Sequence, residues 1–252
     1  MVRSIGFRGL WNECWESRIY SNIIRLNFYI FILLVSFPVF GKENLPICKI
    51  ENNKVISQNI CSGAIKIGEE FTYEGEFNNG RINGKGTFIW LNKNLFNDYV
   101  GEFKNDRLHG KGKLTWVNGD EYIGNFVLGK IEGFGKKNFK NGNYYEGYFI
   151  DGVFNGKGKY IDTNNNIYEG NFKNGNFEGF GKIIYESGDS YNGNWKDGKR
   201  HGIGSLHLKS DGSIYTGEWK NGLPDGIGTI TFKDGKIQKG KFLDGLFIEL
   251  VN

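Results

Sequence analysis

Glycines and aromatic residues alternate with polar residues along most of the chain. In the stretch YEGNFKNGNFEGFGKIIY, Tyr168, Gly170 and Phe172 alternate before the turn NGNFE, and Gly179 and Gly181 alternate after it. A period of two is typical of β-strands, because successive side chains of a strand point to opposite faces of the sheet. Two such segments joined through a loop that contains glycine predict a β-hairpin.

The hairpin pattern repeats along the sequence. Most copies follow one another at 23 residues, as Tyr122 and Tyr145 do. The repeated tyrosine, which always precedes x-Gly, is Tyr73, Tyr99, Tyr122, Tyr145, Tyr168, Tyr191 and Tyr215, and Gln238 takes its place in a last, shortened copy. Turn pairs such as Asn118-Gly119 join successive copies. The pattern predicts an all-β, elongated, open antiparallel meander of hairpins over residues 73–252.

Glycine inside a strand normally weakens the strand, so three glycines on one face of every copy require a reason. A bare glycine surface lets an aromatic ring from the neighbouring strand lie across it. We therefore expect the tyrosines to form a continuous ladder with a second aromatic residue in each copy. These partners are Phe77, Phe103, Phe126, Phe149, Phe172, Trp195 and Trp219.

The composition agrees with a folded chain. Glycine accounts for 39 of the 252 residues, but aromatic residues make up 16%. A disordered glycine-rich linker would lack the side chains that offset the loss of chain entropy.

An uncharged apolar run, FYIFILLVSFPVF, lies near the N-terminus at residues 28–40. Its length suits the central region of a signal peptide better than a membrane span, which needs about 20 residues. We expect residues 1–41 to be a signal peptide cleaved after Gly41, with an uncleaved anchor or a buried strand as alternatives. The protein is then exported to the periplasm or cell envelope, or secreted.

Two cysteines, Cys48 and Cys61, remain after such a cleavage, within residues 42–72. In an exported protein this pair predicts a disulfide that closes a small N-terminal cap. Two free thiols in a cytosolic protein are the alternative. A zinc site is disfavoured, because no CxxC motif or nearby histidine supplies further ligands.

Several copies resemble a known repeat family. YEGEFNNGRINGKGTF at 73–88, YVGEFKNDRLHGKGKL at 99–114 and YTGEWKNGLPDGIGTI at 215–230 are similar to MORN (membrane occupation and recognition nexus) repeats. Asp106 departs from the pattern where a loop glycine is expected, and Gln238 indicates a capping half-repeat. The resemblance implies an extended sheet of hairpins that serves as a platform for protein interaction or dimerisation, sometimes with a link to acidic phospholipids. It also implies that catalysis comes from attached domains, and no such domain is visible in this sequence.

Charge offers a more local candidate site. The net charge is +4, and removal of four arginines and two glutamates with residues 1–41 lowers it to +2, so it indicates no particular partner. A lysine follows Gly-x-Gly in successive copies, at Lys113, Lys136, Lys159 and Lys182. At about 10 Å per hairpin these lysines form a stripe that could contact anionic headgroups or a polyanionic glycan. The alternative is a solvated face paired with neighbouring glutamates.

A second candidate surface is an outward apolar row inside the Gly-x-Gly phrases, formed by Phe134, Phe180, Ile203 and Ile227. Such a row could bind a partner or stack on a sugar. It could also be covered by adjacent long side chains.

No catalytic, cofactor or metal site is predicted. The phrase GRINGKGT at 80–87 has the wrong spacing for a phosphate-binding loop. His109 and His201 are four repeats apart, about 40 Å, which is too far for one metal. Single-stranded nucleic acid is disfavoured, since the rings that would stack on bases face the glycines.

The sequence thus predicts a non-enzymatic scaffold that mediates protein-protein interaction or self-association at the cell envelope or outside the cell. The alternative is peripheral binding to anionic phospholipid or polyanionic glycan through the lysine stripe. An enzyme is the third hypothesis, and no small-molecule substrate is evident.

Overall fold

The computed structural model describes residues 45–92 and 94–251, and every regular element within them is a β-strand. The strands are β1 (Ile50–Glu51), β2 (Lys54–Val55), β3 (Cys61–Ile67), β4 (Phe71–Asn78), β5 (Arg81–Trp90), β6 (Phe96–Lys104), β7 (Arg107–Trp116), β8 (Glu121–Val127), β9 (Lys130–Asn138), β10 (Tyr144–Ile150), β11 (Val153–Ile161), β12 (Ile167–Lys173), β13 (Asn176–Ile184), β14 (Ser190–Lys196), β15 (Lys199–His207), β16 (Ile214–Lys220), β17 (Leu223–Thr231), β18 (Ile237–Leu243) and β19 (Leu246–Leu250).

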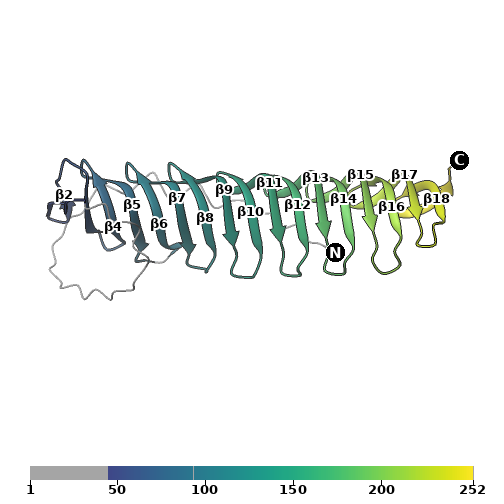
Figure 1. Cartoon of the computed structure of the whole chain (residues 1–252), viewed down its shortest axis with the longest axis horizontal. Coiled ribbons are helices and arrows are strands. Elements are labelled where there is room, and N and C mark those ends of the chain that lie inside the picture. The colour runs from purple at the N-terminus through teal and green to yellow at the C-terminus, as the bar shows by residue number, and fades with distance from the viewer. Residues whose placement is uncertain (1–44, 93, 252) are drawn as a thin grey trace.

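Strands β3 to β19 form one antiparallel sheet in which each strand pairs with the next along the chain. The sheet is open, and its first and last strands lie at opposite ends of the elongated molecule (Figure 1). The predicted all-β meander is therefore confirmed. Residues 42–72, expected as a separate cap, also supply β3 and the start of β4 to this sheet.

Each repeat is one hairpin with a bulge. In the third repeat Gly124 pairs with Gly135 and Phe126 with Ile131, so Asn125 alone faces the longer segment 132–134. Gly133 has φ 72°, the left-handed region that glycine adopts without steric cost. The bulge takes Asn125 out of register with β9, and the Tyr122 hydroxyl donates a hydrogen bond to its carbonyl at 3.1 Å.

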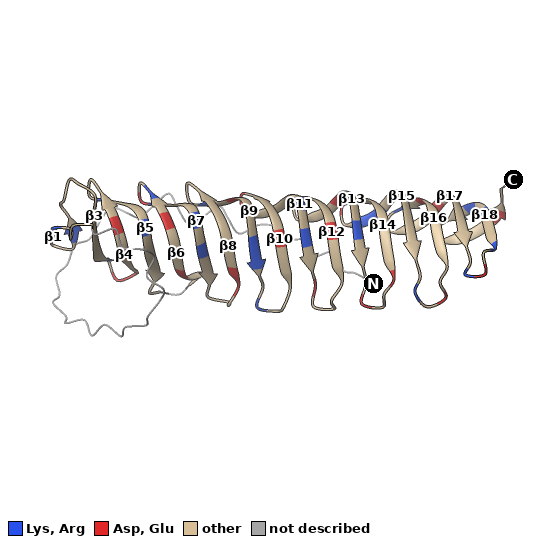
Figure 2. Ribbon diagram, viewed as in Figure 1, with Lys and Arg blue, Asp and Glu red and all other residues tan. Residues whose placement is uncertain are grey.

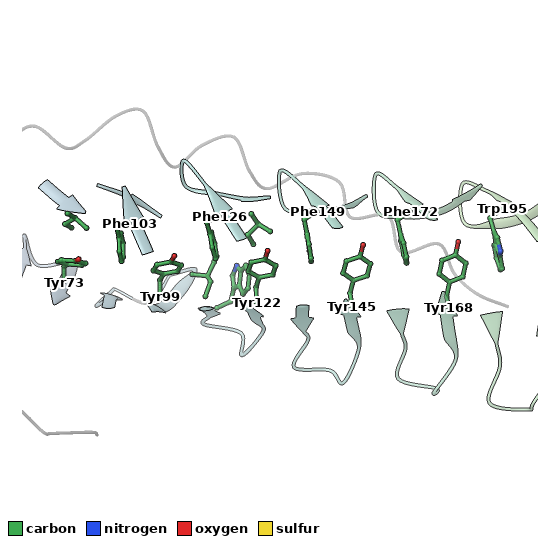
Figure 3. Packing of buried hydrophobic residues seen from close by; sticks show 14 of the residues in the cluster. Tyr73, Tyr99, Phe103, Tyr122, Phe126, Tyr145, Phe149, Tyr168, Phe172 and Trp195 are labelled. Atoms are coloured by element: carbon green, nitrogen blue, oxygen red, sulfur yellow. The ribbon is translucent and has the colours of Figure 1, made fainter. Parts of the chain in front are cut away.

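The aromatic ladder runs along the inner face of this folded sheet. Tyr122 packs edge-on against Phe126 of its own strand and Phe149 of the next repeat, with ring centroids 5.3 and 5.1 Å apart. Figure 3 shows the tyrosines and their partners alternating along the molecule. Each edge-to-face pair contributes about 0.5–1.5 kcal/mol beyond burial of its area. All the residues expected in the repeat core are buried.

Glycines that face the ladder have no room for a side chain. A Cβ on Gly135 would lie 2.6 Å from Cζ of Tyr122, and one on Gly124 would lie 2.5 Å from the same atom. The first glycine of each Gly-x-Gly phrase differs, because the bulge and not an overlying ring requires it. The interpretation that rings cover all three glycines is therefore wrong for Gly133 and its equivalents.

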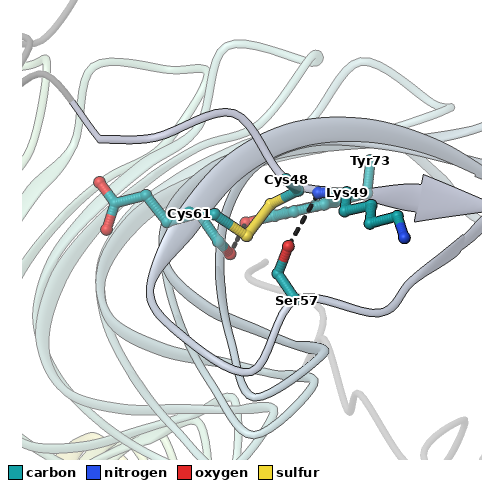
Figure 4. Close-up of a disulfide and its surroundings, with 6 residues drawn as sticks. Cys48, Lys49, Ser57, Cys61 and Tyr73 are labelled. Carbon is teal, nitrogen blue, oxygen red and sulfur yellow. Dashed lines mark hydrogen bonds between the residues drawn. A yellow bond between two sulfur atoms is a disulfide. The ribbon is translucent and has the colours of Figure 1, made fainter.

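A disulfide between Cys48 and Cys61 ties the N-terminal segment to β3, with the Cα atoms 5.0 Å apart (Figure 4). Both cysteines are buried. The Lys49 amide donates to Ser57 Oγ at 2.8 Å inside the closed loop. The predicted signal peptide or anchor, 1–41, lies outside the described residues. Among those that are described, no helix has the length and apolar character to cross a membrane.

Candidate functional site

The outer face of the sheet carries the side chains that alternate with the buried ladder. On β10, for example, Tyr145 and Phe149 are buried, whereas Tyr148 is exposed on the other side. Basic positions on β7, β9, β11 and β13 lie among acidic positions on β10 and β12 (Figure 2). The predicted lysine stripe and apolar row both lie on this face.

The stripe lysines are placed in successive repeats, but most of them are ion-paired. Lys113 Nζ lies 2.6 Å from Glu121 Oε1, Lys136 Nζ lies 3.0 Å from Glu146 Oε1, and Lys159 Nζ lies 2.8 Å from Glu169 Oε1. Lys182 forms no ion pair among the described residues, although Glu169 is its cross-strand neighbour. Exposed pairs of this kind contribute little stability, but they lower the net positive charge of the stripe.

The pair around Glu146 is part of a small network. The Tyr144 hydroxyl donates to Glu146 Oε2 at 2.7 Å. This hydrogen bond, followed by the one from Lys136, lowers the pKa of the Glu146 carboxyl, and the hydrogen bond to Glu146 raises the pKa of Lys136. The charge of Lys136 is thus balanced by a carboxylate within the protein.

The predicted apolar row is exposed along its length. Exposed fractions are 45% for Phe134, 59% for Phe180, 59% for Ile203 and 40% for Ile227. Within the part of the chain that the structure describes, Phe134 alone in this row has an aromatic neighbour, since its ring centroid lies 5.6 Å from that of Tyr148. The row is interrupted by Lys157, which occupies the same position in the fourth repeat.

The histidines do not converge. His109 pairs with Glu102 across β6 and β7, and His201 lines a different depression eight strands away, on β15. Two shallow depressions of about 370 and 380 Å³ contain His109 and His201 respectively. The described part of the chain holds no group of three His, Cys, Asp or Glu side chains able to bind a metal ion.

Sequence reasoning missed the role of the residue before each Gly-x-Gly phrase. Glu132 Oε1 accepts a hydrogen bond from the Asp151 amide at 3.0 Å, and Glu178 Oε2 accepts one from the Asp197 amide at 3.1 Å. Each carboxylate thereby ties its hairpin to the turn of the next. The recurrence of a polar residue at this position was the available signal.

Two cations on the inner face were also missed. Lys137 Nζ lies 4.6 Å from the ring centroids of Trp116 and Phe139 and 3.7 Å from Asp120 Oδ2. Arg200 donates from Nη2 to the Gly222 carbonyl at 2.8 Å, and its guanidinium carbon lies 4.3 Å from the Trp219 centroid. Burial lowers the pKa of both groups.

Comparison with known proteins gives one family. A family model of the MORN repeat matches residues 73–94, 99–121, 122–144, 145–167, 168–190, 191–213 and 215–237. No protein of curated function matches the sequence.

Solved structures offer only distant likenesses. The TCP domain of Drosophila melanogaster SAS-4, solved with a proline-rich motif of Ana2, is 13% identical, with a TM-score of 0.35 over 52% of this chain and 72% of that chain. A mutant TCP10 domain of Danio rerio CPAP is 10% identical, with a TM-score of 0.43 over 75% of this chain and 88% of that one. These scores are too low to transfer a function or a partner.

Proposed function

Because this chain belongs to the MORN-repeat family, we propose that it is a non-enzymatic scaffold whose outer face binds a protein partner. One observation carries the proposal: the residues that define the repeat have structural roles in the fold and are not free to bind a partner. The tyrosines and their aromatic partners form the buried ladder, and the glycines make room for the rings or form the bulges. The outer-face residues are exposed and differ from repeat to repeat, so recognition can vary there.

Photo-crosslinking in cells that produce the protein tests this proposal. A benzoylphenylalanine is placed at one outer-face position at a time, namely 123, 180, 203 or 227, and at the inter-repeat turn residue Asn164 as a control. We expect the same protein to crosslink at adjacent outer-face positions and not at the turn. Absence of any outer-face crosslink, or turnover of an envelope polymer by the purified chain, would contradict a scaffold role.

We further propose an exported location, at the cell envelope or outside the cell. The Cys48–Cys61 disulfide supports it, since structural disulfides persist in oxidising compartments. Alkylation of cell fractions with a maleimide, before and after reduction, tests the location. We expect Cys48 and Cys61 to be labelled only after reduction and only in the exported fraction; labelling without reduction would favour a cytosolic protein.

Self-association is the second interaction that the edges of the sheet support. β19 is an exposed terminal strand in which Leu246, Ile248 and Leu250 are 69%, 51% and 70% exposed. At the other end, the Ser62 amide donates to the Pro46 carbonyl at 3.0 Å, so the segment before β1 covers part of that edge. An exposed apolar edge pairs readily with another strand. Sedimentation velocity should show concentration-dependent dimers that Ile248→Lys abolishes, and a monomer at all concentrations would contradict this.

Peripheral binding to anionic phospholipid or glycan stays an alternative. Lys182 supports it, but the ion pairs of Lys113, Lys136 and Lys159 do not. Co-sedimentation with phosphatidylserine vesicles at low and physiological salt decides between the two. Salt-sensitive binding that is lost when the four stripe lysines are changed to glutamate would favour lipid binding over protein binding as the function of the outer face.

A further inference from the structure

Large apolar side chains gather on the outer face of the third and fourth repeats. We call them the repeat 3–4 patch: Val127, Leu128, Phe134, Tyr148, Ile150 and Val153, which are 45%, 56%, 45%, 51%, 57% and 37% exposed. Phe134 and Tyr148 are direct cross-strand neighbours on β9 and β10, and Ile150 and Val153 are cross-strand neighbours on β10 and β11. The patch therefore continues from the hairpin turns onto the face of the sheet.

The other repeats serve as internal controls, because they have the same backbone at the same positions. Where this patch has Val127 and Ile150, four other repeats have Lys104, Lys173, Lys196 and Lys220. Where it has Tyr148, four others have Glu102, Asn125, Asn171 and Asn194. The fold does not require apolar residues at these positions, so their gathering in two adjacent repeats indicates a binding surface.

Leu128 sharpens this contrast. It lies in the hairpin turn with φ 51°, where the equivalent residues of neighbouring repeats are Asn105, Asp151 and Asn174. Asparagine and aspartate tolerate the left-handed region, whereas the left-handed conformation of leucine lowers stability by about 1 kcal/mol. Strained residues of this kind cluster at sites of recognition. Leucine is thus found at a position where its side chain is exposed and its backbone is strained.

Two lysines lie on either side of the patch, and a carboxylate accompanies one of them, because Glu102 Oε1 accepts a hydrogen bond from the Lys111 backbone amide at 3.3 Å. Lys111 and Lys157 occupy the position of Phe134 in the second and fourth repeats, and their cross-strand neighbours are Asn125 and Asn171. Within residues 45–92 and 94–251, neither lysine forms an ion pair. Their positions are two repeats apart, about 20 Å along the sheet.

We infer that the repeat 3–4 patch binds an acidic protein segment. Apolar side chains at its centre pack on Phe134 and Tyr148, and carboxylates on either side pair with Lys111 and Lys157. The inference rests on the proposed scaffold function and names the chemistry of the partner. A flat anionic bilayer fits less well, because Glu146 and Asp151 lie on the same surface and neutralise Lys136 and Lys130.

Selection from a phage-displayed library of random 16-residue peptides on the full chain tests the inference. We expect enriched peptides with an apolar or aromatic centre and acidic residues on both sides, and binding that weakens as salt is raised. The double variant Phe134→Lys, Tyr148→Asn carries residues that other repeats have at these positions, so it should fold normally. It should weaken binding of the enriched peptides about 30-fold, as expected for loss of interface hot spots.

Ile237→Lys is the control, because it also replaces an exposed apolar side chain with lysine, at a residue that is 66% exposed on β18 and lies outside both the patch and the predicted apolar row, and it should leave binding of the enriched peptides unchanged. Reversing the flanking charges with Lys111→Glu and Lys157→Glu should instead select basic flanks. Peptides without acidic flanks, binding that survives the double variant, or binding to phosphatidylserine vesicles that the double variant abolishes would overturn the inference. If partners still crosslink at residues 180, 203 or 227 in that case, the scaffold function stands and only this site falls.

Discussion

Neighbouring glycines of one phrase are needed for different physical reasons. Gly133 adopts a positive φ in a bulge, and the nearest atom to an added Cβ there is 3.6 Å away, on the Asn125 side chain. Gly135 has ordinary strand geometry, but an added Cβ would run into the Tyr122 ring. Glycine is therefore required at both positions: the backbone conformation excludes other residues at Gly133, and the ring contact excludes them at Gly135.

Gly135→Ala should therefore destabilise the protein by about 2–3 kcal/mol, because the Tyr122 ring is fully buried and has no space to withdraw. Urea unfolding followed by circular dichroism measures the change. Gly129→Ala is the control: it has φ 89° and no atom within 4 Å of an added Cβ, so only the backbone strain of about 1 kcal/mol is expected. Equal losses in the two variants would contradict the ring contact as the cause.

Leu128→Asn should do the opposite and stabilise the protein by about 1 kcal/mol. The change relieves the left-handed strain and removes an exposed apolar side chain. A higher urea midpoint with an unchanged slope is the expected reading. Val127→Asn changes the adjacent residue, which has no positive φ, and should bring no such gain. A loss of stability in Leu128→Asn would mean that the leucine packs within the fold.

At the level of the strand pair, the residue that packs beside the ladder tyrosine differs between repeats. In the fourth and fifth repeats Phe154 and Phe177 stack on Tyr145 and Tyr168 at 3.7 Å. The equivalent residue on β15 is Arg200, whose guanidinium is 5.7 Å from the Tyr191 centroid. In the sixth repeat a cation thus occupies a position that holds phenylalanine in the fourth and fifth repeats, whereas the remaining repeats have Ile82, Leu108, Ile131 and Pro224 there.

Arg200→Phe should raise stability by about 1 kcal/mol, because a stacked ring replaces a desolvated cation whose pKa burial has lowered. Arg200→Ala should lower the free energy of unfolding by about 2 kcal/mol, since it removes the packing of the side chain and leaves a gap against Trp219. Chemical unfolding of both variants gives the comparison. If the phenylalanine variant were as unstable as the alanine variant, the hydrogen bond to Gly222 would be the dominant contribution.

For the whole molecule, the ladder makes stability depend on alkaline pH. Burial raises the pKa of Tyr122, Tyr191 and Tyr215 to about 12, and it also raises the pKa of the other ladder tyrosines, Tyr73, Tyr99, Tyr145 and Tyr168. The unfolded value is 10.0. Because the folded pKa is higher, this stability is fully present below pH 10 and is lost as pH rises towards 12.

At pH 11 each ladder tyrosine ionises more readily in the unfolded state than in the folded state, which lowers the free energy of unfolding by about 1.4 kcal/mol. The sum over the ladder is comparable to the net stability of a typical domain. We therefore expect cooperative unfolding near pH 11, with tyrosinate absorbance at about 295 nm rising together with the loss of circular dichroism. Gradual ionisation centred at pH 10 in a protein that stays folded would show that the ladder is open to solvent.

The sequence by itself determined the repeat, the strands and the faces. Alternation with period two and the 23-residue spacing of residues such as Tyr122 and Tyr145 are local properties, so no long-range contact is needed to predict a meander of hairpins. The pairing of Cys48 with Cys61 could also be predicted, because the proposed cleavage leaves two cysteines.

Only the tertiary structure decided which outer-face residues act together. The ion pair of Lys136 with Glu146 and the contact of Phe134 with Tyr148 cross from one repeat to the next, so they depend on strand register. The positive φ of Leu128 depends on the turn that joins β8 and β9. Register and turn conformation are set by bulges and by packing on the ladder, which sequence periodicity does not specify.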